Sequence, residues 1–181
     1  MFVRTKRLVL RPGWREDAPA VFAAIADEAV VRNLARAPWP YALENAESWL
    51  AQPHDPRRPS LLILSAEGGG APVPIGGIGL HDGESGGVEL GYWLGRRWWG
   101  RGYATEAGRA VVAAARDSLR LPRIAAGHFI DNPASGRVLE KLGFRPRGGV
   151  VSRFSAGRGE EARCRLMELD FAEEGTAAMA A

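Results

Sequence analysis

The chain has 181 residues, one cysteine and a formal net charge of only +3, with 24 basic residues against 21 acidic ones. A chain of this length can bury the core of one domain, and its dispersed, nearly balanced charge argues against a nucleic-acid-binding surface. No apolar run approaches 18 residues, so we expect no membrane-spanning helix. The opening segment, 1–7, is too charged for a signal peptide.

The single cysteine, Cys164, lies in a stretch where apolar residues alternate, so we interpret it as a strand residue and not as a nucleophile. A lone thiol cannot form a disulfide within the chain, which fits the reducing cytoplasm. The three histidines, His54, His81 and His128, do not have the spacing of metal ligands, and no metal site is expected.

The first half of the chain has the hydrophobic pattern of strands and two helices. We expect strands at 8–10, 60–66, 73–80 and 88–94, and helices at 17–34 and 44–51. The run 61–64 is continuously apolar, which indicates a strand buried on both faces. The glycines within 76–79 indicate a strand against which another group packs closely.

In the second half of the chain we expect a long helix, a strand, a shorter helix and two final strands. We expect helices at 103–119 and 132–142, and strands at 123–130, 143–154 and 163–171. No long linker or internal repeat divides the chain, so 1–171 is predicted to be a single domain. The segment 172–181 has no packing pattern, and we expect a disordered tail there.

A glycine pair, Gly100-x-Gly102, joins the strand at 88–94 to the helix that begins at Tyr103. Two glycines allow a tight turn and a close approach of a ligand to the backbone. The free amides of the first helical turn and the helix dipole favour an anion. The loop is not a nucleoside-triphosphate loop, because the Gly-Lys-Ser/Thr ending is missing, and it is not a dinucleotide fingerprint, because no third glycine follows. The arginines Arg96, Arg97 and Arg101 around it favour a phosphate-bearing ligand.

A second segment begins at Asn132 and reads Asn-Pro-Ala-Ser-Gly-Arg-Val-Leu-Glu-Lys-Leu-Gly-Phe. Asn132 can cap a helix, Pro133 suits its first position and Gly143 can end it. These local rules explain most of the segment as a helix, with one apolar face.

Together the two segments resemble the GNAT superfamily of acetyl-CoA-dependent N-acetyltransferases, in the family's order and about 30 residues apart. The matching patterns are Arg97-x-x-Gly100-x-Gly102 and Asn132-x-x-Ser135-x-x-x-Leu139-x-x-x-Gly143-Phe144. The opening Thr5-x-Arg7-Leu8-x-Leu10-Arg11-Pro12 and the segment 88–94 resemble the RimJ/RimL branch. The resemblance covers roughly residues 4 to 170. It implies an α/β (α+β) fold with a mostly antiparallel mixed sheet of about seven strands, splayed between the fourth and fifth, and about four helices.

The resemblance also implies how acetyl-CoA (coenzyme A) would be held. Pantetheine would lie along the main chain of the splayed strand, beside Tyr92, Trp93 and Leu94. Asn132 and Ser135 would contact it, and Arg137, with Lys141 one turn later, would reach towards the nucleotide. The pyrophosphate would be held by the loop and the start of the next helix, at Arg97, Trp99, Gly100, Arg101, Gly102, Tyr103 and Ala104.

For catalysis, the resemblance implies that a base takes a proton from the amine before attack on the thioester. Glu89, an acid on the splayed strand, is the first candidate, acting through a water, and His81 is the second because its ordinary pKa of about 6.5 suits neutral pH. Many relatives place a tyrosine seven residues after the asparagine to protonate the thiolate, but Leu139 stands there. Ser135 is the candidate that remains for this role.

The acceptor is predicted to be a primary amine, either a protein N-terminus or a small molecule. An aminoglycoside is the alternative, but its pocket should be acidic, and the segment 30–45 offers Glu44 against Arg32 and Arg36. A non-catalytic acyl-CoA-binding module also fits the motifs. An aromatic wall of Trp39, Tyr41 and Phe154 could line the acceptor site. We expect a cytoplasmic protein without nucleic-acid or membrane partners, and a homodimer is left open.

Overall fold

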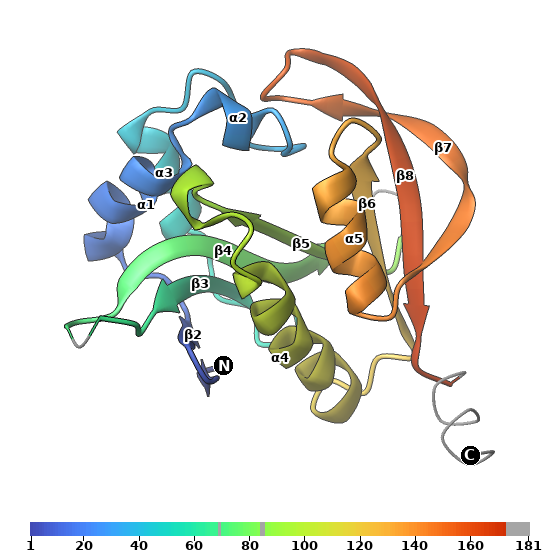
Figure 1. The fold of residues 1–181 in the computed structure, drawn as a ribbon, viewed down its shortest axis with the longest axis horizontal. Helices are drawn as coiled ribbons and strands as arrows, with labels where there is room; N and C mark the ends of the chain where they lie inside the picture. The colour runs from blue at the N-terminus through green and yellow to red at the C-terminus, as the bar shows by residue number, and fades with distance from the viewer. Residues whose placement is uncertain (69, 84–85, 173–181) are drawn as a thin grey trace.

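The computed structural model describes residues 1–68, 70–83 and 86–172, and these form one mixed sheet with helices on both faces (Figure 1). The strand order is β1-β2-β3-β4-β5-β6-β8-β7. The strands are β1 (Val3–Arg4), β2 (Leu8–Arg11), β3 (Ser60–Ser65), β4 (Val73–Asp82), β5 (Val88–Leu94), β6 (Arg123–Phe129), β7 (Arg145–Ser155) and β8 (Glu160–Asp170). The helices are α1 (Ala18–Ile25), α2 (Glu28–Val31), α3 (Leu43–Leu50), α4 (Tyr103–Asp117) and α5 (Pro133–Lys141), with 3-10 turns η1 (Arg15–Asp17) and η2 (Arg96–Trp98).

The expected fold class is confirmed, with one strand more than the sequence pattern indicated. The additional strand is β1, whose two residues pair antiparallel with β2. A strand of two residues is too short to have an alternating hydrophobic pattern, so β1 could not be predicted from the sequence. The predicted tail lies outside the described residues from 173 onward.

Two cores, one on each face of the sheet, hold the fold together. The run 61–64 in β3 is buried on both faces, as its pattern predicted: Leu61 and Ile63 join the core beneath α4 and α5, whereas Leu62 and Leu64 join the core beneath α1, α2 and α3. Successive residues of a strand point to opposite faces, so one continuous apolar run serves both cores.

The expected single helix over 17–34 is broken into two. Helix α1 ends at Ile25, and the backbone of Asp27 is extended. The side chain of Asp27 accepts a hydrogen bond from the amide of Ala29 at 2.8 Å. An aspartate in this role starts a new helix, and α2 is one turn long. Periodicity alone missed the break because the apolar spacing continues through it.

The sheet opens between β5 and β6, as expected from the resemblance. These parallel strands share one register pair in the described chain, Glu89 with Ala125. The amide of Gly95 donates to Ile75 of β4 at 2.9 Å. Because main-chain groups alternate in direction along an antiparallel strand, the N–H and C=O groups of Tyr92 and Leu94 point away from β4, towards the opening.

Candidate active site

A cavity of about 1120 Å³ runs through this opening and is lined from both faces of the sheet. At one end lie the glycine loop and the starts of α4 and α5. At the other end lie the segment between α2 and α3, the end of β4, and the odd-numbered residues of β5. The cavity therefore connects a candidate cofactor end with a candidate acceptor end.

The glycine loop has the backbone that its sequence predicted. Gly100 and Gly102 have φ angles of 74° and 81°, in the left-handed region that glycine adopts without strain. Gly102 is the N-cap of α4, and its carbonyl accepts a hydrogen bond from the amide of Glu106 at 3.0 Å. The amides before Glu106 in the first turn have no such partner within the helix, which makes this end of α4 suited to an anion.

The arginines of the loop surround it but do not line the cavity. The guanidinium groups of Arg97 and Arg101 lie 5.2 and 5.3 Å from the ring centre of Trp98. Trp99 does line the cavity, and its indole donates to the carbonyl of Leu94 at 2.7 Å. The arginines therefore add positive potential near the loop, while its backbone and Trp99 form the surface that a ligand would meet.

The N-terminal segment fastens the loop to the sheet, a role that the sequence pattern did not show. Arg7 donates to the carboxylate of Glu106 at 2.7 Å and to the carbonyl of Arg101 at 3.0 Å, and its guanidinium lies 4.5 Å from the ring centre of Tyr103. Thr5 donates to the same carboxylate at 2.6 Å. Burial raises the pKa of Glu106, but the hydrogen bonds from Thr5 and Arg7 outweigh it and hold the pKa below its usual value. Because Arg7 neutralises this acid, α4 keeps a favourable end for an anion.

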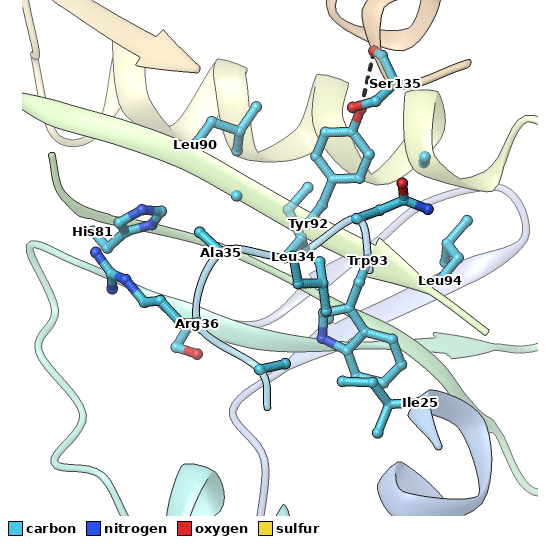
Figure 2. Close-up of a pocket in the computed structure, with 18 of the residues that line it drawn as sticks. Ile25, Leu34, Ala35, Arg36, His81, Leu90, Tyr92, Trp93, Leu94 and Ser135 are labelled. Atoms are coloured by element: carbon cyan, nitrogen blue, oxygen red, sulfur yellow. Dashed lines mark hydrogen bonds between the residues drawn. The ribbon is translucent and has the colours of Figure 1, made fainter. Parts of the chain in front are cut away.

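The open edge of β5 faces the start of α5 across the cavity. The hydroxyl of Tyr92 lies 2.7 Å from the Ser135 hydroxyl (Figure 2). Asn132 caps α5, and its side chain accepts from the amide of Ser135 at 3.3 Å. Burial raises the pKa of Tyr92 to about 12, so the phenol is neutral at physiological pH. Both hydroxyls and Asn132 line the cavity, as do Arg137 and Lys141 one turn apart on α5.

At the acceptor end, Glu89 and His81 are a register pair on neighbouring strands, so their side chains share a face. Glu89 is only 8% exposed, and both of its carboxylate oxygens accept hydrogen bonds from Arg153 of β7, at 2.6 and 3.2 Å. Burial, reinforced by the positive charge of Arg36, lowers the pKa of His81, so its imidazole is neutral at pH 7. Arg153 lies 64 positions after Glu89, and no sequence signal links the two.

The aromatic lining differs from the expected wall. Phe154 is 53% exposed and points away from the cavity. Successive residues of β7 point to opposite faces, and it is the neighbouring Arg153 that points inward, to Glu89. Trp39 is also exposed and does not line the cavity, whereas Tyr41 does. The wall is completed by Trp49 of α3 and Trp93 of β5, whose rings meet edge to face with centroids 6.4 Å apart.

The side chain of Trp93 therefore lies on the acceptor face, opposite Tyr92 (Figure 2). The glycines of β4 make room for it: a Cβ on Gly77 would lie 2.6 Å from the Trp93 indole nitrogen. This is the close packing that the glycines within 76–79 predicted.

A family model described as an acetyltransferase (GNAT) domain matches residues 7–145. The chain belongs to the GNAT acetyltransferases. An N-acetyltransferase of Bacillus subtilis, YoaA, named as uncharacterised, is 32% identical over 157 residues, which cover 81% of this chain and 84% of that protein. This GNAT chain is thus similar over most of its length to a protein named for the same activity.

Two solved structures show the same fold. A GNAT-family acetyltransferase of Bacillus anthracis superposes with a TM-score of 0.79 at 22% identity, covering 94% of this chain and 98% of that one. A spermidine N-acetyltransferase of Vibrio cholerae, solved with CoA and spermine, superposes with a TM-score of 0.73 at 18% identity, covering 93% and 98%. Among the described residues of this GNAT domain, no helix is long and apolar enough to cross a membrane.

Proposed function

We propose that the protein transfers the acetyl group of acetyl-CoA to a primary amine by direct attack on the thioester. The observation that carries the proposal is one cavity that joins the glycine loop at the start of α4 to the Glu89–His81 pair. An anion site and a proton-accepting site on a shared channel are what this reaction requires. The opening Thr5-x-Arg7 pattern and Ser135 support a RimJ/RimL-like member. The presence of a single cysteine, Cys164, which cannot form a disulfide within the chain, supports a cytoplasmic location.

The residues present suit coenzyme A from end to end. The amides around Gly100, Gly102 and Ala104 would hold the pyrophosphate, and Arg137 the nucleotide end. The outward main-chain groups of Tyr92 and Leu94, with Asn132, would hold the pantetheine. When bound, acetyl-CoA supplies a thioester whose carbonyl an amine can attack.

Glu89 is proposed as the proton acceptor, through a water that bridges its carboxylate to the amine. Two hydrogen bonds from Arg153 fix the orientation of the carboxylate, while leaving lone pairs for a water. His81, neutral and on the same face, is the alternative base.

Tyr92 and Ser135 are proposed to stabilise the departing sulfur by hydrogen bonding. Burial raises the pKa of Tyr92 well above that of a thiol such as the cysteine side chain, at about 8.5, so full transfer of the phenolic proton to a thiolate would be uphill. The paired hydroxyls are therefore better suited to donating hydrogen bonds to the sulfur than to giving up a proton.

Replacing Tyr92 with phenylalanine is accordingly expected to lower kcat only about fivefold, the worth of one neutral hydrogen bond. Ser135→Ala should have a similar effect, and the double variant should lose less than the product of the two, because the hydroxyls act as a pair. Steady-state kinetics at saturating acetyl-CoA measure this. A thousandfold loss in Tyr92→Phe would instead make the phenol an obligatory acid.

Thermal unfolding with acetyl-CoA, and with AMP as the control, tests the proposed function. Ligand at 100 times its Kd should stabilise the fold by about 2.7 kcal/mol, a rise of several degrees in Tm. A rise with acetyl-CoA, together with thiol release in the presence of amines, supports the transferase. Binding without turnover of any amine would identify a non-catalytic acyl-CoA-binding module, and no rise at millimolar ligand would refute the proposal.

A further inference from the structure

At the acceptor end of the cavity, one arginine forms no ion pair with any acid that the structure describes. Three arginines line this end, and two of them are engaged: Arg58 with Asp82 at 2.8 Å, and Arg153 with Glu89 at 2.6 Å. The third, Arg36, donates to the main-chain carbonyl of Asp82 at 3.3 Å. Within residues 1–68, 70–83 and 86–172, no carboxylate forms an ion pair with it.

Arg36 also faces the site of proton transfer. Figure 2 shows its side chain beside His81, and its charge contributes to lowering the pKa of that histidine. A guanidinium presents several N–H donors in a planar fork that matches a carboxylate with two parallel hydrogen bonds. A carboxylate of the acceptor would thus find its partner beside His81, the register neighbour of Glu89.

Further along β5 from the Glu89–His81 pair, at Trp93, the cavity lining becomes apolar. The edge-to-face rings of Trp49 and Trp93 form its wall, together with Tyr41, Leu34 and Ile25. Figure 2 shows Leu34, Trp93 and Ile25 gathered away from Arg36. Aromatic and aliphatic walls of this kind stabilise an apolar side chain by burying its surface.

Among the residues that the structure describes, the acids that line the cavity do not suit a polycation. Asp82 and Glu89 are already paired with arginines, and Asp55 accepts a hydrogen bond from the amide of Arg57. A polyamine would bring several positive charges next to Arg36 with few free acids to compensate them.

From this arrangement we infer that the acceptor is an α-amino acid with an apolar side chain, an inference that rests on the proposed acetyl transfer. The amine lies over Glu89 and His81, the carboxylate binds Arg36, and the side chain enters the hollow at Trp49 and Trp93. An α-carbon carries an amine, a carboxylate and a side chain, and the cavity lining includes a partner for each of them. In the transfer, the amine nitrogen forms the bond to the acetyl carbon, the carbon–sulfur bond breaks and coenzyme A leaves as its thiolate. One proton of the amine passes to Glu89 through the bridging water.

The test compares phenylalanine with phenethylamine, which has the same ring and amine but no carboxylate, by measuring thiol release from acetyl-CoA. Phenylalanine should have the higher kcat/KM, by about tenfold or more, the worth of a hydrogen-bonded charge pair. Arg36→Gln should remove this preference, mainly through the KM for phenylalanine. The ratio between the two amines is the readout, because any change at His81 affects both equally.

Arg32→Gln is the matched control. It removes the same charge from the same loop, but Arg32 is exposed, pairs with Asp131 at 3.2 Å and lies outside the cavity lining. Its ratio should equal that of the unmodified protein. Equal effects of the two substitutions, or faster turnover of phenethylamine or spermine than of phenylalanine, would overturn the inference.

The outcomes also separate this inference from the proposed function. Thermal stabilisation by acetyl-CoA with turnover of carboxylate-free amines alone would overturn the amino-acid acceptor and leave the transferase intact. Stabilisation without turnover of any amino acid would overturn the acceptor as well. If acetyl-CoA neither stabilises the protein nor releases thiol, the proposed function itself fails, and the assignment of the acceptor fails with it.

Discussion

Gly102→Trp is expected to lower the affinity for acetyl-CoA at least 100-fold, about 2.7 kcal/mol, while the protein remains folded. Gly102 is the N-cap of α4 with a φ angle of 81°, and an indole there would stand over the amides that we propose hold the pyrophosphate. An added Cβ would meet its nearest neighbour, an Arg7 nitrogen, at an ordinary 3.6 Å, so the backbone strain at the positive φ angle is the structural cost that a control has to match. Calorimetric titration measures the affinity, and circular dichroism checks the fold.

Gly148→Trp is the matched control for this substitution. Gly148 has a similar left-handed φ angle of 66°, and an added Cβ would have no atom within 4 Å, but it lies in β7 and not in the cavity lining. It therefore reproduces the backbone strain and the added indole without touching the loop. Undiminished binding by Gly102→Trp, or an equal loss in both variants, would remove the glycine loop from the cofactor site.

Glu89→Gln is expected to lower kcat by about 10²- to 10⁴-fold, the usual contribution of a general base, with little change in the KM for acetyl-CoA. His81→Gln should lower kcat less than about fivefold. Since the pKa of His81 is lowered below its ordinary 6.5, a His81 base would make activity fall with decreasing pH through a value below 6.5, and His81→Gln would abolish that limb. If Glu89 is the base, the acid limb survives in His81→Gln.

The Glu89 substitution also breaks a buried ion pair, so a structural loss has to be distinguished from a chemical one. Arg153→Gln breaks the same pair and leaves the carboxylate in place. If catalysis depends on the carboxylate, Arg153→Gln should retain much more activity than Glu89→Gln at equal folded fraction, judged from thermal unfolding. Equal losses of activity in Glu89→Gln and Arg153→Gln would mean that the ion pair only supports the fold. A loss of kcat of about 100-fold or more in His81→Gln would instead assign the base to His81.

Local patterns predicted those features that depend on neighbouring residues in the chain. The run 61–64 indicated a strand buried on both faces, and it is shared by two cores. The Gly100–Gly102 pair indicated a turn into a helix, and both glycines have left-handed backbones before α4. Asn132 indicated a helix cap and makes one. Each of these depends on backbone geometry and side-chain periodicity within a few residues.

What the sequence determined from its own residues is therefore most of the helices and strands, the glycine turn before α4 and the face-by-face burial of β3, because these follow from local conformation and periodic hydrophobicity. The fold followed from the resemblance of two motifs to the GNAT superfamily. The tertiary structure alone decided the acceptor end, where β7 brings Arg153 to Glu89 across 64 residues and the α2–α3 segment brings Arg36 to His81. It also decided that Phe154 faces outward and Trp49 inward. Such pairings are set by how distant elements pack against one sheet, and no short-range pattern encodes the charge or shape that results.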